Sequence, residues 1–122
     1  MTSILINLSN HPTAGWSEAQ LAASMPYGDL VDMPFPQVDP SIDEEALRTL
    51  VDVYAAQVAA YRDEHSVTVH LMGEMTFCFA LINRLRGEGI TCVASCTERM
   101  VELLSDGVKR ATFQFVRFRE YR

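Results

Sequence analysis

The sequence is short of positive charge, and this shortage limits the partners that the protein can bind. Its 122 residues include 10 Lys and Arg against 16 Asp and Glu, a formal net charge of −6. Proteins that bind long nucleic acid neutralise phosphates with a basic surface. Basic residues gather only late in the chain, at Lys109, Arg110, Arg117, Arg119 and Arg122. We therefore expect no long nucleic acid as a partner, while a small anion held by a few local groups stays possible.

Cysteine is also scarce, and long hydrophobic runs are missing. Cys78, Cys92 and Cys96 lie in apolar stretches and are odd in number, which favours reduced, structural thiols in a cytoplasmic protein. No apolar run is long enough to span a membrane and no signal peptide is recognisable, so we expect no membrane partner. Dinucleotide-binding, P-loop, zinc-protease and Cys-x-x-Cys motifs are absent, and we predict no metal and no cofactor.

What the sequence does contain is a regular alternation of strand and helix signals, and 48% hydrophobic residues in one domain over residues 1–122. Short apolar runs predict strands near 3–8, 29–33, 67–72 and 90–95. Helical signals lie near 17–25, 41–61 and 75–88, the first two opening on capping boxes at Ser17 and Ser41. Asp106-Gly107 predicts the turn of a hairpin between 100–104 and 108–118. A change of face between Phe115 and Val116 predicts either a β-bulge or a strand buried on both sides.

This order, β-α-β-α-β-α-β followed by an antiparallel β-hairpin, predicts an α/β fold. Alternating strands and helices favour a mostly parallel, Rossmann-like sheet with helices on both faces. Right-handed crossovers give the strand order 2-1-3-4, with the hairpin extending one edge. Residues 67–77 form its centre: a buried strand, a turn at Gly73, and a helix so apolar on every side that we expect it to be buried.

Polar residues follow three of the predicted strands. In such a sheet, ligands bind beyond the carboxyl ends of the strands, where the strand order reverses. The predicted ligand-binding groups are Ser9, Asn10 and His11 with Trp16 nearby; Gly73, Glu74 and Thr76; and Ser95, Thr97, Glu98 and Arg99. We expect these three groups to converge on one site, with Trp16 as a lid or a base-stacking platform.

The residue types at this site suit cleavage of a phosphodiester without a metal. His11 and Glu74 are the acid–base candidates, and Arg99, Thr76 and helix N–H groups can hold a phosphate. Asn10 can orient a ribose hydroxyl or a phosphate oxygen. A ribose 2′-hydroxyl can then attack its own neighbouring phosphate, which requires mainly alignment and charge stabilisation.

Each of these residues also has a structural interpretation. His11 can simply shape a turn before a proline. Thr76 is a typical helix N-cap, and Glu74 can form an ion pair with Arg99. His70, inside a predicted strand, is more typical of a hydrogen-bonded core histidine than of a ligand-binding residue.

Several motifs resemble a family of small stand-alone CRISPR-associated proteins, and together they cover almost the whole chain. They are Ile-Leu-Ile-Asn-Leu-Ser-Asn-His-Pro at 4–12, Pro-Phe-Pro-x-Val-Asp-Pro at 34–40, His-Leu-Met-Gly-Glu-Met-Thr-Phe at 70–77, Cys-Val-Ala-Ser at 92–95 through Glu98-Arg99, and Phe-Val-Arg-Phe-Arg-Glu-Tyr at 115–121. The sequence is similar to the small CARF-like proteins of type III CRISPR systems.

The resemblance implies a Rossmann-like domain in a two-fold homodimer, with a cyclic oligoadenylate bound across the axis. Several such proteins are ring nucleases, which open this second messenger and switch off type III signalling. By position, Asn10, His11, Gly73, Glu74, Thr76 and Arg99 would line the ring. The expected function is thus a ring nuclease for cyclic oligoadenylate, most simply cyclic tetra-adenylate. The alternative is a non-catalytic module that senses or sequesters the nucleotide.

Overall fold

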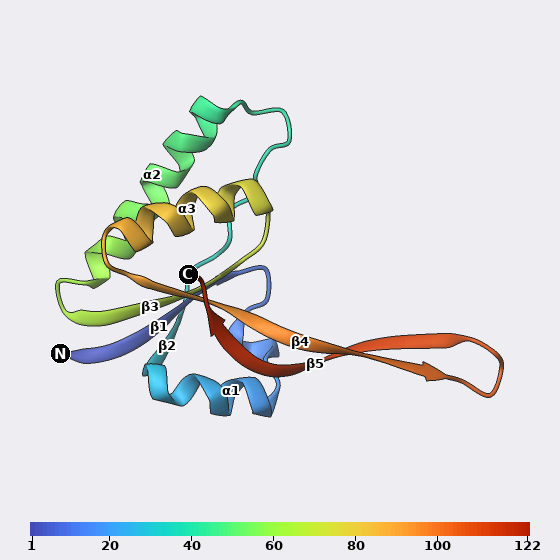
Figure 1. Cartoon of the computed structure of the whole chain (residues 1–122). Coiled ribbons are helices and arrows are strands. Elements are labelled where there is room, and N and C mark those ends of the chain that lie inside the picture. Colours follow the sequence, from blue (N-terminus) through green and yellow to red (C-terminus); the bar gives the residue numbers. More distant parts are fainter.

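The computed structural model describes all residues from Met1 to Arg122 as an α/β fold with one sheet between helices (Figure 1). The strands are β1 (Thr2–Ser9), β2 (Asp29–Asp32), β3 (His65–Met72), β4 (Thr91–Leu103) and β5 (Lys109–Glu120). The helices are α1 (Glu18–Ser24), α2 (Glu44–Tyr61) and α3 (Met75–Gly87), with short 3₁₀ turns η1 (Thr13–Gly15) and η2 (Met25–Tyr27). No helix combines the length and the hydropathy needed to cross a membrane.

The strands lie in the order β2-β1-β3-β4-β5. β1 pairs in parallel with β2 and β3, β3 pairs in parallel with β4, and β5 is antiparallel to β4. The sheet is therefore mixed, and the predicted 2-1-3-4 order is confirmed. α2 and α3 cover one face and α1 covers part of the other, as expected when crossovers run on both sides (Figure 1).

The prediction for the end of the fourth strand was wrong. We expected a loop after Ser95 containing Thr97, Glu98 and Arg99, but all of these residues lie within β4, which continues to Leu103. β5 pairs with β4 from Leu103 back to Val93, and so satisfies its backbone groups along that length. The strand and the first half of the expected hairpin are thus one element.

A β-bulge interrupts this ladder, as one reading of the sequence predicted. Cys96 pairs with Arg117, but the next residue, Thr97, pairs with Phe115. Val116 is the extra residue on β5. A bulge bends a strand and increases its local twist, and here it lies where the two strands leave the body of the protein.

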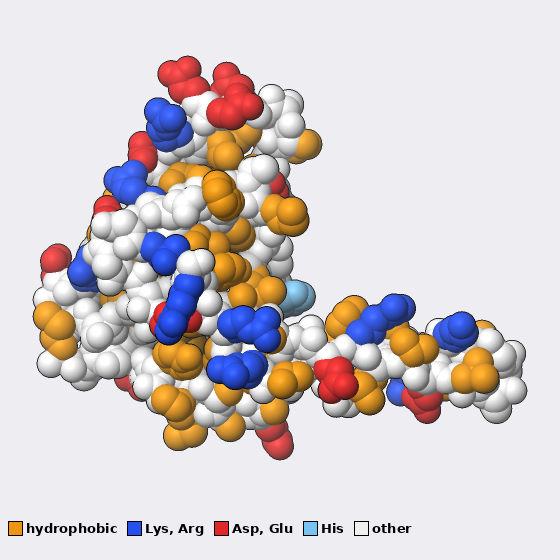
Figure 2. Space-filling view, viewed as in Figure 1, with side chains coloured by type: hydrophobic (Ala, Val, Ile, Leu, Met, Phe, Trp, Pro, Cys, Tyr) orange, Lys and Arg blue, Asp and Glu red, His pale blue; other side chains and the backbone are white.

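Beyond the bulge the two strands project as a long ribbon, which we call the arm (Figures 1 and 2). The arm consists of residues 97–103 of β4 and residues 109–115 of β5, joined by the predicted Asp106-Gly107 turn. Gly107 has a φ of 84°, a left-handed conformation that favours glycine. Phe115 at the base of the arm packs against the α1 side of the body, but several large hydrophobic side chains farther out are exposed.

The main core lies between the sheet and the α2–α3 pair. Leu5 and Val93 face the α1 side, whereas Ile6, Leu8 and Leu71 face the main core and are fully buried. The expectation that α3 is buried all round was wrong, because Met75 is 79% and Phe79 is 72% exposed. α3 packs on the sheet and on α2, which leaves its third side open to solvent.

The start of α2 also differs from the prediction. Asp43, not Ser41, is its N-cap, and the Asp43 carboxylate accepts the Ala46 N–H at 2.9 Å. Ser41 instead donates its N–H and hydroxyl to Asp39 in a turn before the helix. Ser17 does cap α1 as predicted, accepting the Gln20 N–H.

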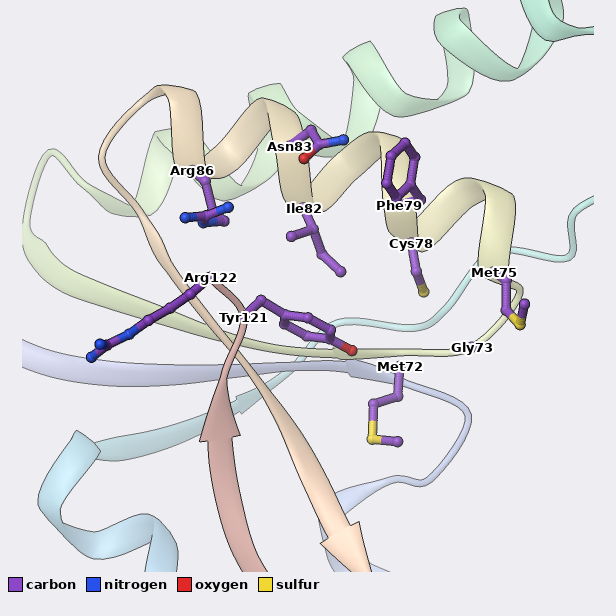
Figure 3. A pocket seen from close by; sticks show the side chains of 10 residues that line it. All are labelled: Met72, Gly73, Met75, Cys78, Phe79, Ile82, Asn83, Arg86, Tyr121 and Arg122. Carbon is purple, nitrogen blue, oxygen red and sulfur yellow. The ribbon is translucent and has the colours of Figure 1, made fainter.

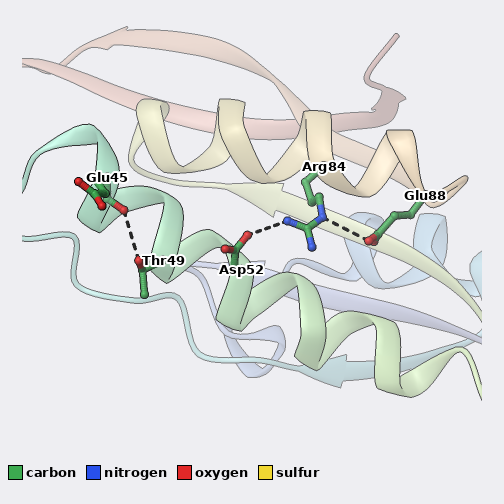
Figure 4. A network of polar contacts seen from close by, with 5 residues as sticks. All are labelled: Glu45, Thr49, Asp52, Arg84 and Glu88. Atoms are coloured by element: carbon green, nitrogen blue, oxygen red, sulfur yellow. Dashed lines mark hydrogen bonds and ion pairs between the residues drawn. The ribbon is translucent and has the colours of Figure 1, made fainter.

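Surface polar contacts join α2 to α3 (Figure 4). The Arg84 guanidinium lies 2.7 Å from Asp52 of α2 and 3.3 Å from Glu88 at the end of its own helix. Thr49 donates to the Glu45 carbonyl within α2. All these groups are exposed, and such pairs contribute little free energy, so the apolar core is what sets the position of α3.

Candidate functional site

A chain of polar groups, with Asn7 and His70 buried at its centre, runs across β1, β3 and β4 near the carboxyl ends of β1 and β3. His70 Nδ1 lies 2.9 Å from Asn7 Oδ1, and His70 Nε2 lies 2.7 Å from the Ser95 hydroxyl. Ser95 also accepts a hydrogen bond from Gln20 Nε2 of α1 at 3.0 Å. His70 and Asn7 are each only 2% exposed, so these hydrogen bonds replace the water that burial excludes.

The partners of Asn7 fix the direction of these bonds. The Asn7 amide nitrogen donates to the His11 carbonyl and to Asp32, which leaves Oδ1 as an acceptor. His70 must then carry its proton on Nδ1 and accept the Ser95 hydroxyl proton on Nε2. Burial, with a smaller effect from His11, lowers the pKa of His70 to about 4. His70 is thus neutral and hydrogen-bonded, which confirms the structural interpretation of this residue.

The same network holds the backbone of His11. The His11 carbonyl accepts the Asn7 amide at 2.8 Å and the Trp16 indole N–H at 2.9 Å. The His11 N–H donates to the Ser9 hydroxyl, which in turn donates to Asn7. The His11 side chain itself is exposed. A fixed main chain therefore presents a free imidazole to solvent.

Asp32 of β2 anchors the other end of this loop. Its carboxylate accepts bonds from the Asn7 amide and from the N–H and hydroxyl of Thr13. Burial raises the pKa of Asp32, but these hydrogen bonds outweigh it and hold the pKa below its usual value. The segment from Ser9 to Trp16 is therefore tied down at both of its ends.

A hollow of about 490 Å³ opens beside His11, between this segment, α1 and the base of the arm. We call it the His11 hollow. It contains three of the predicted site residues, His11, Trp16 and Thr97, and it adds Gln20, Phe113 and Phe115. Trp16 is 7% exposed, and its ring packs edge-on against His70 at 5.2 Å. Trp16 thus forms a wall of the hollow and part of the core.

Glu74 and Thr76 do not line the His11 hollow. The Glu74 carboxylate is the N-cap of α3 and accepts bonds from the N–H groups of Thr76 and Phe77 and from the Thr76 hydroxyl. These bonds lower the pKa of Glu74, with Phe77 the largest cause. The prediction that Thr76 is the N-cap was wrong, since Glu74 precedes the helix and has the longer reach. Both residues line a separate acidic hollow of about 400 Å³.

Gly73 is required by a close neighbour rather than by an unusual φ. A Cβ atom at this position would lie 2.3 Å from Cζ of Phe35, whose ring packs against Phe77. Gly73 also lines a groove of about 410 Å³ beside α3 (Figure 3), and His11 is not among the residues that line it. In this groove Cys78 and Ile82 of α3 point toward Tyr121, with Met75 at one end and Arg86 and Arg122 at the other.

The remaining predicted residues fall into two groups. Ser9 and Ser95 belong to the buried network, directly behind the His11 loop. Asn10, Glu98 and Arg99 are exposed and their side chains make no hydrogen bond. The expected Glu74–Arg99 ion pair is not formed, because Arg99 lies on the arm and Glu74 caps α3.

Sequence reasoning missed Asn7, Gln20, Phe113 and Phe115 as parts of the site. Asn7 did carry a signal, since it is a polar residue inside the apolar run Ile4–Leu8. Of the two phenylalanines, Phe115 was considered only for the change of face next to Val116. Gln20 was considered only as part of the capping box that begins at Ser17. No three His, Cys, Asp or Glu side chains lie close enough together to hold a metal ion.

Two comparisons with known proteins bear on these residues. A search of curated proteins found no match to the chain. A family model, described as Uncharacterized protein MJ1673 family, matches residues 3–119 and thus spans all five strands and three α-helices. The chain belongs to this MJ1673 family.

Proposed function

We propose that the protein binds a cyclic oligoadenylate in the His11 hollow and opens it as a metal-independent ring nuclease. The observation that carries this proposal is the hollow itself: a free imidazole on a fixed backbone, beside the Thr97 hydroxyl and three aromatic side chains. Aromatic faces stack on bases, and an imidazole can move a proton in a phosphodiester cleavage. The ligand class and the CRISPR role come from the motif resemblance.

The arm adds groups that suit a chain of nucleotides. Phe113 and Phe115 line the hollow, and Arg99 is the cross-strand partner of Phe113. Lys109 lies on the same face of the ribbon toward its tip. Aromatic rings interleaved with cations form the usual surface for a single-stranded nucleotide ligand. A small ligand of this kind needs only a locally positive surface, which an acidic protein can supply.

The fold supports the same location. The first four strands have the 2-1-3-4 order of doubly wound, Rossmann-like sheets, and the order reverses between β1 and β3. His11 follows β1 directly, at this switch point. We propose that the domain is a CARF-like variant of this fold, in which β5 and the arm replace further parallel strands. Such a domain would act in the cytoplasm as a homodimer.

The proposed reaction is an internal transesterification. A ribose 2′-oxygen attacks the adjacent phosphorus, the bond from phosphorus to the 5′-oxygen breaks, and the products are a 2′,3′-cyclic phosphate and a 5′-hydroxyl. The 2′-hydroxyl loses its proton and the leaving 5′-oxygen gains one, and His11 is the group that moves a proton. Thr97 and Arg99 hold the phosphate. Glu74 acts in this scheme as a helix cap and not as the partner of His11.

The alternative is a module that binds the ring without cutting it. One observation favours it: His11 is the only titratable side chain that lines the hollow. The Glu74 carboxylate, which was expected beside His11, instead caps the N-terminus of α3. A transesterification is faster with separate groups to remove and to donate the proton. A sensor or a sequestering protein would need the aromatic walls and the cations alone.

Incubation with labelled cyclic tri-, tetra- and hexa-adenylate in EDTA, resolved by chromatography, separates these functions. A ring nuclease yields linear products from one ring, and His11→Ala abolishes cleavage while leaving ligand binding within a few-fold. Glu74→Gln serves as the control and retains cleavage. Intact ligand with a mobility shift establishes the binding module. Neither cleavage nor binding by the wild-type protein rejects both.

A further inference from the structure

The arm has one apolar face and one polar face. Cross-strand partners share a face, and the face that continues the α1 side of the sheet carries Thr97–Phe115, Arg99–Phe113, Val101–Ala111 and Leu103–Lys109. The other face carries Glu98–Gln114, Met100–Thr112 and Glu102–Arg110. Phe113, Val101 and Leu103 are 67%, 55% and 71% exposed. Phe115 packs partly against the body, but beyond it large hydrophobic side chains line a face of the ribbon that nothing else in the chain covers.

A two-stranded ribbon with an exposed apolar face lacks a packing partner for that face. An isolated two-stranded hairpin is marginally stable in water, and an exposed apolar strip signals an interaction surface. The seven residues from Lys109 to Phe115 extend roughly 20 Å at about 3.3 Å per residue. Figure 2 shows the ribbon projecting away from the body. The apolar face therefore needs a partner of similar shape.

We propose that the partner is the same face of a second copy of the chain. The two arms stack antiparallel about a two-fold axis that passes between the Arg99–Phe113 and Val101–Ala111 pairs. This axis lies between the two stacked ribbons and runs perpendicular to their strands. It therefore places β4 over β4 and β5 over β5 of the second copy, in opposite directions. Each protomer then contributes one arm to an isologous contact, and the two bodies lie at opposite ends.

The face is complementary to its own image in this arrangement. Phe113 lies over Ala111 of the second copy, so a large side chain meets a small one, as well-packed layers require. The aliphatic stem of Arg99 lies over Val101 while its guanidinium stays at the edge of the ribbon on the side of Thr97, and Lys109 lies over the Phe115 ring, where a cation is favoured. No two like charges oppose one another. A pattern that matches itself under a two-fold axis favours a second copy over an unrelated protein.

This pairing also brings a cation to the candidate site. The Leu103–Lys109 pair at the tip of one arm lies over the Thr97–Phe115 pair of the other copy, and Thr97 and Phe115 line the His11 hollow. The tip of each arm thus closes the hollow of the other copy, and Lys109 supplies a positive charge beside His11. The role of Lys109 in ligand binding rests on the proposed function; the pairing of the arms does not.

Sedimentation velocity tests the pairing with two neighbouring substitutions. Val101 and Met100 are 55% and 42% exposed and lie on opposite faces of β4. Val101→Asp is expected to raise the dimer dissociation constant at least ten-fold, whereas Met100→Asp leaves it within about two-fold. A monomeric wild-type protein, or equal weakening by the two variants, overturns the proposal.

Disulfide trapping tests the register. In a Cys96→Ser background, Arg99→Cys chains mixed with Val101→Cys chains are expected to form a cross-linked dimer under mild oxidation. Arg99→Cys mixed with Met100→Cys is the control, because Met100 lies on the other face. Equal cross-linking of both mixtures contradicts the stacked arrangement.

Substitution of two adjacent cations at the tip of the arm, Lys109 and Arg110, tests whether the tip contacts the His11 hollow of the other copy. Lys109→Ala is expected to weaken binding of labelled cyclic tetra-adenylate at least ten-fold while raising the dimer dissociation constant no more than about two-fold. Arg110→Ala, which removes a cation paired with Glu102 on the polar face, is expected to leave binding unchanged. Equal affinities of the two variants overturn the role of Lys109. Absence of binding by the wild-type protein refutes the proposed function and that role together, while sedimentation still decides the arm pairing.

Discussion

The Ser95 hydroxyl lies 2.7 Å from Nε2 of His70 and joins β4 to β3 directly behind the loop that carries His11. Through Nδ1 the same imidazole reaches Asn7, and through Asn7 the His11 carbonyl. The exposed candidate residue His11 is thus positioned by a buried network rather than by contacts of its own side chain. Rigid support of this kind is what a functional site needs from the residues behind it.

Ser95→Ala tests this support. The substitution leaves Nε2 of His70 without a donor in a buried position and removes the acceptor of Gln20, so unfolding is expected to require about 1–3 kcal/mol less free energy. Thr97→Ala, two residues along the same strand and exposed, is the control and is expected to change stability by less than about 0.5 kcal/mol. Urea denaturation of the two variants measures the difference. Equal stability of Ser95→Ala and wild type would show that the His70–Ser95 bond contributes nothing.

The buried His70 gives stability a defined dependence on pH. Its pKa is about 4 in the folded protein against 6.5 as the ordinary value. The unfolded chain therefore binds more protons between these values, and stability falls as the pH drops from 6.5 toward 4. The loss over this range is about 3 kcal/mol at roughly 1.4 kcal/mol per pH unit. Thermal unfolding of wild type and His70→Gln across this range measures it, and parallel curves for the two proteins would contradict it.

Gly73 and Phe35 are expected to behave as a coupled pair. Gly73→Ala places a methyl group 2.3 Å from the Phe35 ring, which must move away from Phe77. We expect a loss of about 1–3 kcal/mol from this overpacking. Phe35→Leu removes part of the clash, so the double variant should lose less than the sum of the single variants. Strict additivity in a denaturation cycle would show that the ring does not impose the glycine.

The three cysteines are expected to react at different rates. Burial raises the pKa of Cys78 to about 12 and that of Cys92 to about 11, and both thiols are nearly inaccessible. Cys96 is partly exposed on β4. Titration of the folded protein at pH 8 with an aromatic disulfide should therefore modify Cys96 first and the others only on unfolding. Loss of the fast phase in Cys96→Ser confirms the assignment, and a fast phase that persists contradicts it.

The sequence by itself determined the elements and their order. β-branched apolar runs, helical periodicity and capping residues were enough to predict four parallel-type strands, three helices and the 2-1-3-4 arrangement, because right-handed crossovers leave few alternatives. The bulge near Val116 was also visible as a change of face. These features depend on local periodicity and chirality, which the chain carries wherever it folds.

Tertiary structure decided what the polar residues do. Glu74 and His11 follow neighbouring strands, yet Glu74 turns back to cap α3 while His11 faces the base of the arm. Ser95 and Arg99 looked like members of one loop, but β5 pairs with β4 and makes them parts of a single strand. Hydrogen-bond partners and strand length depend on which segments meet across the sheet, and a linear pattern does not contain that information.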